Sequence, residues 1–177
     1  MALSYVPAAP LLFGLAGWSG SGKTTLGVEL ISYFTQAGYR VGTIKHAHHE
    51  FDADIEGKDS WRHRKAGAVN VIVSSDMRTA HFTEHAETAP PSLEELLERS
   101  QELDIVMVEG FKKEPVPKIE VWRAETQKPF LYPDDVEIKA VASPEALADC
   151  PLPQLDLNNP QQIAAYILES GHFKRPV

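Results

Sequence analysis

Residues 11–24 read LLFGLAGWSGSGKT, an apolar run of six residues followed by a glycine-rich segment. A short apolar run that ends in glycine is typical of a buried parallel strand. Beyond the glycines, Leu26, Leu30 and Phe34 recur with the spacing of one helix face. The pattern G-x-x-x-x-G-K-T between such a strand and such a helix predicts a phosphate-binding loop.

This loop is expected to hold a nucleotide through its backbone and two side chains. Glycines let successive N–H groups turn toward phosphate oxygens, and the start of the helix adds a partial positive charge. Lys23 would reach the β- and γ-phosphates, and Thr24 would offer a hydroxyl to Mg²⁺. The alternative, a glycine-rich turn with a lysine by chance, is disfavoured by the flanking strand and helix. The residues expected at the nucleotide are Gly17, Ser19, Gly20, Ser21, Gly22, Lys23, Thr24 and Thr25.

Predicted strands and helices alternate along the rest of the chain. We therefore expect an α/β fold: a three-layer sandwich with a mostly parallel central sheet and antiparallel edge strands, in a single domain over residues 1–177. The predicted strands are 11–16, 39–45, 70–74, 77–83, 105–108, 118–123 and 140–142, and the predicted helices are 23–37, 60–66, one after the capping box at 92–95, and one that starts at Asn159.

Composition narrows the classes of function. The 177 residues are 43% hydrophobic and 24% charged, which is ordinary for a globular protein. With 17 basic and 25 acidic residues the net charge is -8, a poor match to nucleic acid. The single cysteine cannot form an internal disulfide, and an apolar run of six residues is far short of the roughly 20 that span a bilayer. We expect a cytoplasmic protein that binds neither nucleic acid nor membrane.

A nucleotide loop of this kind also needs a carboxylate near Mg²⁺. Glu109 follows the apolar run 105–108, so we expect it to serve catalysis with Lys23 and to bind the metal with Thr24; a solvated glutamate at a strand end is the alternative. Asp54 begins a D-x-x-G pattern found in GTPase switches, although no apolar strand precedes it. We include Asp54 as a metal ligand and Asp59 at the cofactor. Because N-K-x-D is absent, the residues leave the base open.

Histidines and arginines gather between the second and third predicted strands. His46, His48 and His49 follow a strand at its carboxyl end, where they could hold Zn, Ni or Cu, line a phosphate pocket or face solvent. His46 is included in the expected cofactor site. Arg62 and Arg64 are candidates to clamp a second phosphorylated ligand, with a solvated surface as the alternative.

Two longer segments carry a family resemblance. The sequences KHAHHEFDAD at 45–54 and GKDSWRHRKAGA at 57–68 resemble the molybdopterin-guanine dinucleotide biosynthesis protein B family, as do VEGFK at 108–112 and the phosphate loop. The resemblance covers residues 12–141. This chain departs from the family at Glu56, where proline is usual, and at Pro144, where an acidic residue is expected.

The resemblance implies a GTP-binding accessory protein of molybdenum-cofactor maturation, with a fold similar to dethiobiotin synthetase and nickel-insertion GTPases. It implies GTP and Mg²⁺ as cofactors, molybdopterin or its guanine dinucleotide as a ligand, and a partner nucleotidyltransferase that joins GMP to molybdopterin. It also implies slow GTP hydrolysis and a homodimer. Two other functions stay open: a nucleotide-driven metallochaperone that uses His46, His48 and His49, and a small-molecule kinase that uses the same loop.

Overall fold

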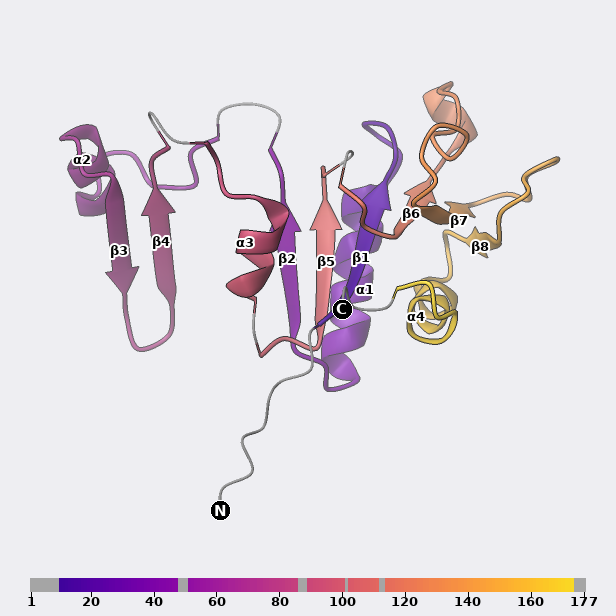
Figure 1. Cartoon of the computed structure of the whole chain (residues 1–177), viewed down its shortest axis with the longest axis horizontal. Helices are drawn as coiled ribbons and strands as arrows, with labels where there is room; N and C mark the ends of the chain where they lie inside the picture. The colour runs from indigo at the N-terminus through magenta and orange to yellow at the C-terminus, as the bar shows by residue number, and fades with distance from the viewer. Residues whose placement is uncertain (1–9, 48–50, 86–88, 101, 112–113, 174–177) are drawn as a thin grey trace, which may run out of the picture. The chain divides into compact units, whose positions relative to one another are not determined.

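The structure is a computed structural model, and it describes residues 10–47, 51–85, 89–100, 102–111 and 114–173. The chain divides into two compact units: unit 1 comprises Met1–His46 and Leu93–Val177, and unit 2 comprises Ala47–Ser92. Unit 2 is therefore inserted between two segments of unit 1 (Figure 1). The prediction of one domain over residues 1–177 stays a prediction, because compactness alone does not show whether the units fold independently.

A six-stranded parallel sheet forms the centre of unit 1. Its strands are β1 (Leu11–Ala16), β2 (Val41–Lys45), β5 (Ile105–Glu109), β6 (Lys118–Val121), β7 (Ile138–Ser143) and β8 (Gln154–Asp156). They lie in the order β2-β5-β1-β6-β7-β8, and every neighbouring pair is parallel. The sequence predicts the first five to within two residues at each end. It misses β8, because three residues are too few to show an alternating pattern.

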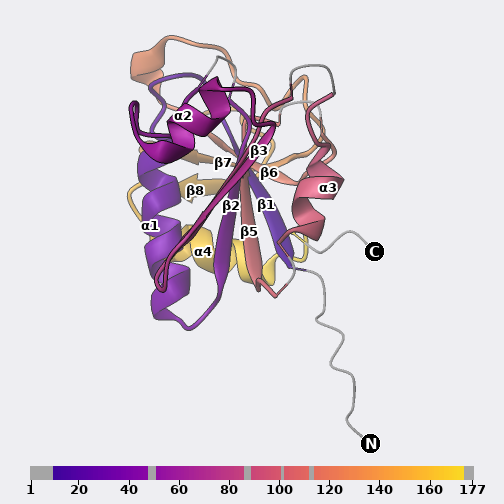
Figure 2. The same cartoon turned by 90° about the vertical axis from the view of Figure 1, so that its left-hand side faces the viewer.

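Helices cover both faces of this sheet and make unit 1 a three-layer α/β sandwich. They are α1 (Lys23–Gln36), α3 (Leu93–Glu98) and α4 (Pro160–Glu169). Figure 2 shows α1 and α3 on opposite sides of the sheet. One buried apolar cluster packs α1 and α4 against the sheet, and a second cluster includes Leu93 of α3. The predicted α/β class is confirmed.

Local sequence explains where the two longer helices form. In α1, Leu26, Leu30 and Phe34 make the predicted apolar stripe and are at most 1% exposed. In α4, the side-chain oxygen of Asn159 accepts a hydrogen bond from the backbone N–H of Gln162 at 3.1 Å. This bond satisfies one of the free N–H groups at the helix start, as the sequence predicts.

The strand order determines where a ligand can approach unit 1. β1 lies between β5 and β6, with Leu15 level with Glu109 and Ala16 level with Glu120. The three strands are parallel, so their carboxyl ends meet at one edge of the sheet. Ligands of open parallel sheets bind at this edge. The glycine-rich segment after Ala16 begins there.

Unit 2 consists of one short helix and one hairpin: α2 (Asp59–Lys65), β3 (Asn70–Ser74) and β4 (Thr79–Thr83). The sequence predicts all three and the antiparallel pairing of the strands. It does not predict that β3 and β4 form a separate two-stranded sheet instead of extending the edge of the main one. None of the described helices is long and apolar enough to span a bilayer.

Candidate functional site

The glycine-rich segment forms a tight turn between β1 and α1. Gly17 and Gly22 have positive φ angles of 141° and 99°, and residues other than glycine rarely adopt such backbone angles. A Cβ atom on Gly17 would collide with the carbonyl oxygen of Val121 on β6. Gly22 is the N-cap residue of α1. Because glycine has no side chain, it offers the backbone N–H groups at the start of the helix no side-chain acceptor. The glycines therefore allow a tight turn at this point; that the turn binds phosphate stays a prediction.

Lys23 closes this turn. Its Nζ atom donates hydrogen bonds to the carbonyl oxygens of Gly17 and Trp18, both at 2.9 Å. Ser19, Gly20, Thr24 and Thr25 are exposed around it. Ser21 differs: its side chain is 1% exposed, and its Oγ atom has no hydrogen-bond partner among the described residues. A phosphate could therefore meet the ammonium of Lys23 and the hydroxyl of Thr24 from solvent, while the side chain of Ser21 lies beneath the turn.

Glu109 ends the strand next to β1. Its carboxylate lies 3.6 Å from Nζ of Lys45, the residue level with it on β2, and its side chain is 19% exposed. The backbone carbonyl of Glu109 accepts a hydrogen bond from the N–H of His46 at 2.9 Å, and the His46 ring lies edge-on to Phe111. Since β5 and β1 are adjacent, the glycine-rich turn and Glu109 share one edge of the sheet. A threonine hydroxyl and a carboxylate at such an edge are oxygen ligands of the kind that Mg²⁺ prefers.

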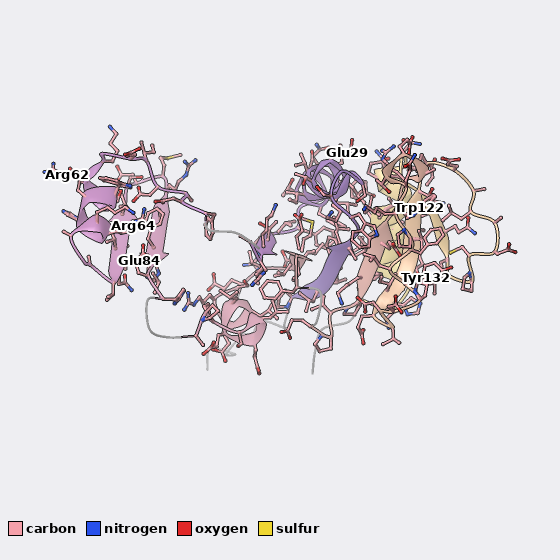
Figure 3. The ribbon with its side chains drawn as sticks, turned by 90° about the horizontal axis from the view of Figure 1, so that it is seen from above. Glu29, Arg62, Arg64, Glu84, Trp122 and Tyr132 are labelled. Atoms are coloured by element: carbon pink, nitrogen blue, oxygen red, sulfur yellow. The ribbon has the colours of Figure 1, made fainter. Side chains whose placement is uncertain are left out.

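The other predicted site residues belong to unit 2, and two of them, Asp54 and Arg64, form an ion pair with each other. Arg64 donates to Asp52 at 2.6 Å, to Asp54 at 3.1 Å and to Glu84 at 2.7 Å, and its side chain is 11% exposed. Figure 3 shows Arg64 and Glu84 directed toward each other and Arg62 directed away from them. We call Asp52, Asp54, Arg64 and Glu84 the Arg64 cluster.

The Arg64 cluster bears on two predicted roles. Asp54 also accepts hydrogen bonds from the Ser60 hydroxyl at 2.8 Å and from the Ile55 N–H at 2.9 Å, so both of its oxygens have partners. These contacts count against Asp54 as a metal ligand and against Arg64 as a phosphate clamp, because each would have to give up its partners. Asp59 and Arg62 are exposed, and their predicted roles at the cofactor stay predictions.

Hydrogen bonds within this cluster favour the charged forms of Asp52, Asp54 and Arg64. Hydrogen bonds from Arg64 and from the Asp54 N–H hold the pKa of Asp52 below its usual value. Burial alone would raise the pKa of Asp54, but hydrogen bonds from Ser60, Arg64 and Ile55 outweigh it and lower that pKa. The carboxylates in turn raise the pKa of Arg64. All of these groups are charged at neutral pH.

Three histidines were predicted as candidate ligands or pocket residues. His46 is described, whereas His48 and His49 lie outside the described residues. Within the described part of the chain, no three His, Cys, Asp or Glu side chains are grouped to hold a metal ion.

Two residues on β6 and just after it were not predicted from sequence. Arg123 follows β6, and its Nε atom donates to the carbonyl oxygen of Ser21 at 3.2 Å. Glu120 of β6 is fully buried and accepts hydrogen bonds from the N–H groups of Leu131 and Tyr132 at 2.7 and 3.0 Å. Burial raises the pKa of Glu120. One signal could have identified Arg123: it is the first cation after a strand that runs beside β1 in a parallel sheet.

A parallel sheet whose central strand leads through a glycine-rich turn into a covering helix defines the class: an α/β protein built around a phosphate-loop-like turn. The sequence then assigns the family within that class. The model of the family "Molybdopterin guanine dinucleotide synthesis protein B" (MobB) matches residues 12–144. The chain belongs to this family, and the predicted resemblance is confirmed.

Named relatives agree with this assignment. The chain is 42% identical over 158 residues to the molybdopterin-guanine dinucleotide biosynthesis adapter protein of Haemophilus influenzae, covering 88% of this chain and 86% of that one. It is 40% identical over 161 residues to the adapter protein of the same name from Escherichia coli, covering 89% and 91%. A crystal structure of molybdopterin-guanine biosynthesis protein B superposes with a TM-score of 0.71 at 27% identity, over 90% of this chain and 98% of that chain.

Proposed function

We propose that this chain is a GTP-binding adapter in the synthesis of molybdopterin guanine dinucleotide. In this proposal it binds GTP with Mg²⁺ at the turn between β1 and α1, and it assists the nucleotidyltransferase that joins GMP to molybdopterin. It acts in the cytoplasm as a homodimer and hydrolyses GTP slowly. The family and the adapter names of the relatives support the pathway.

One observation carries the nucleotide part of the proposal: Lys23 is held over a glycine-rich turn at the start of a helix. A lysine ammonium, backbone N–H groups and a helix N-terminus all attract phosphate. Thr24 and Glu109 would hold Mg²⁺, which when bound neutralises charge on the phosphates. Lys23 would orient the β- and γ-phosphates.

The test is calorimetric titration of the protein with GTP, ATP and GDP in the presence of Mg²⁺. Lys23→Ala should weaken GTP binding by about 2–4 kcal/mol, because it removes a charge-assisted contact to phosphate. Lys139→Ala, which removes a lysine from β7 of the same sheet, serves as the matched control and should bind GTP like the wild type. Equal GTP affinity of the wild type and Lys23→Ala would exclude the turn as the nucleotide site.

The adapter part needs a separate assay. We expect wild-type protein with GTP to stimulate formation of the dinucleotide by the pathway's nucleotidyltransferase. Arg62→Ala should reduce this stimulation while GTP affinity stays within about threefold, roughly 0.65 kcal/mol. Arg62 suits this test because it is exposed and lies outside the Arg64 cluster. Weaker GTP binding, with full stimulation once GTP is raised to saturation, would instead assign Arg62 to the nucleotide site.

The metallochaperone and kinase alternatives receive no comparable support. Neither activity is named among the relatives cited above. Calorimetry with Ni²⁺ or Zn²⁺ in the absence of nucleotide tests the first: a chaperone would bind the ion tightly, and His46→Ala would weaken that binding.

A further inference from the structure

Arg123 lies against the phosphate turn from the neighbouring strand. β6 pairs with β1, and the chain continues past Val121 to bring Arg123 beside the start of α1. Its Nε atom donates to the Ser21 carbonyl at 3.2 Å. A Cβ atom placed on Gly22 would lie 3.4 Å from Nε and 3.8 Å from Nη2 of Arg123. The guanidinium therefore covers the residue from which α1 starts.

The charge of Arg123 is not balanced within the described chain. Among the arginines that the structure describes, Arg64 and Arg123 are partly buried and all the others are exposed. Arg64 holds three carboxylates, whereas no ion pair connects Arg123 to any described carboxylate. A guanidinium has five N–H donors, and the bond to Ser21 uses one of them. A half-buried cation with free donors beside a phosphate turn is suited to an anion.

The loop after β6 holds this arginine in place. The hydroxyl and the N–H of Thr126 both donate to the Arg123 carbonyl, at 2.8 and 3.2 Å. Trp18 of the turn donates its indole N–H to the carbonyl of Pro129 at 2.8 Å, and Nζ of Lys128 lies over the Trp18 ring. Contacts of the loop with Trp18 and of Arg123 with Ser21 thus join the loop to the beginning and to the end of the phosphate turn. Arg123 is positioned in advance, and little ordering is needed when an anion binds.

The two cations mark opposite ends of the turn. Lys23 bonds to the carbonyls of Gly17 and Trp18, where the turn begins, and Arg123 bonds to Ser21, where it ends. In loops of this type the lysine reaches the β- and γ-phosphates, while the backbone near the helix start surrounds the α- and β-phosphates. We propose that Arg123 is a second phosphate-binding cation, and this proposal rests on the proposed function. Its Nη atoms contact the α- and β-phosphates, which GTP and GDP share.

The proposal predicts a selectivity pattern that differs from that of Lys23. Arg123→Met keeps much of the side chain and removes the charge, so it should weaken GTP and GDP binding by the same factor, about 10- to 100-fold. Lys23→Met should weaken GTP more than GDP, because only GTP has a γ-phosphate. Arg123→Lys keeps the charge but cannot keep the fork that binds Ser21 and phosphate together, so it should recover at most part of the affinity.

Calorimetric titration of the full chain with GTP and with GDP measures these factors. Lys139→Met removes one positive charge from β7, the strand on the other side of β6, and is the matched control, with both affinities expected within threefold of the wild type. Circular dichroism and thermal unfolding of each variant check that it folds. Unchanged affinities in Arg123→Met, or a loss confined to GTP, would overturn the assignment while leaving the proposed function intact. A wild-type protein that binds neither nucleotide would overturn the proposed function, and the Arg123 proposal with it.

Discussion

Glu109 forms an ion pair with Lys45 at the edge of the sheet that it shares with the glycine-rich turn. The ion pair with Lys45 is partly exposed, so it contributes little to stability and leaves the carboxylate available. Glu109→Gln keeps the shape of the side chain and removes its charge. We expect Mg²⁺ to enhance GTP affinity at least tenfold less in this variant than in the wild type, with metal-free binding within about threefold.

Titrations with GTP in Mg²⁺ and in EDTA measure this enhancement. Glu114→Gln, a change to an exposed carboxylate that follows the same strand, is the control. If Glu109→Gln keeps the full enhancement, another carboxylate meets the metal, and exposed Asp59 is then the first to test.

The buried carboxylate of Glu120 anchors the loop that follows β6. Each of its two oxygens accepts a backbone N–H of the loop that follows β6. In Glu120→Gln one of these oxygens becomes an NH₂ group facing an N–H, so one charge-assisted bond is lost and two donors oppose each other. We expect the free energy of unfolding to fall by about 2 kcal/mol, measured by urea denaturation. Glu125→Gln, an exposed change on the same loop, should alter it by no more than about 0.5 kcal/mol.

At the scale of elements, α2 is joined to the hairpin of β3 and β4 by the Arg64 cluster. Arg64 lies on α2 and Glu84 directly follows β4. Because the pKa values of Asp52 and Asp54 are lowered in the folded state, their contribution to stability is fully present above the unfolded value near 3.8. It is lost as the pH falls through the lower folded values.

Removing Arg64 should reverse this pH dependence. In Arg64→Met three carboxylates face one another without a cation, and their mutual repulsion raises their pKa values. The wild-type unit should then lose stability as the pH falls below 4, whereas the Arg64→Met unit should gain stability as the pH falls from 7 to 5. Trp61, the single tryptophan of unit 2, reports this by fluorescence once Trp18 and Trp122 are changed to Phe.

Arg62→Met makes the same change at an exposed position of the same helix and is the control. It should keep the wild-type pH dependence. An Arg64→Met protein whose stability stays constant or falls as the pH falls from 7 to 5 would show that Arg64 does not hold the cluster.

Helices and strands with strong local sequence patterns could be predicted, whereas the pairing of strands and the contacts between elements could be predicted less well. The stripe of α1 and the apolar run of β1 follow from spacing alone. The pairing of β3 with β4 follows from their closeness in sequence, but nothing local says that the pair stands apart from the main sheet. At the site, the motif identifies Lys23 and Thr24, whereas Glu120 and Arg123 become visible only when β6 is known to pair with β1. The contacts of Arg64 depend in the same way on a hairpin partner 20 residues away.

At the scale of the whole molecule, unit 1 contains all six parallel strands and both buried clusters. Among the described residues of unit 2, Val71 is the single buried apolar side chain. We therefore expect a variant in which a short Gly/Ser linker replaces residues 47–92 to keep its circular dichroism and unfold in one cooperative transition. The isolated segment 47–92 should be unfolded, since so short a chain with so small a core is marginal.

Urea denaturation and proton NMR of both fragments check these expectations. A folded 47–92 fragment would show that the chain is two domains. An unfolded linker variant would show that unit 1 needs the insertion to fold, and an unfolded fragment beside a folded linker variant would support a single domain with an insertion.

The strand order also has a consequence for synthesis of the protein on the ribosome. β1 and β2 do not pair with each other; both pair with β5, which is made much later. After β2 is complete the ribosome must add residues 46–104 before β5 begins, which takes roughly 3–12 s at about 5–20 residues per second. Hairpins close within microseconds, so β3 and β4 can meet during this interval while the apolar strand β1 still lacks neighbours. A nascent chain stalled before residue 105 would expose that strand, and the first half of the protein is where we expect chaperones to bind during translation.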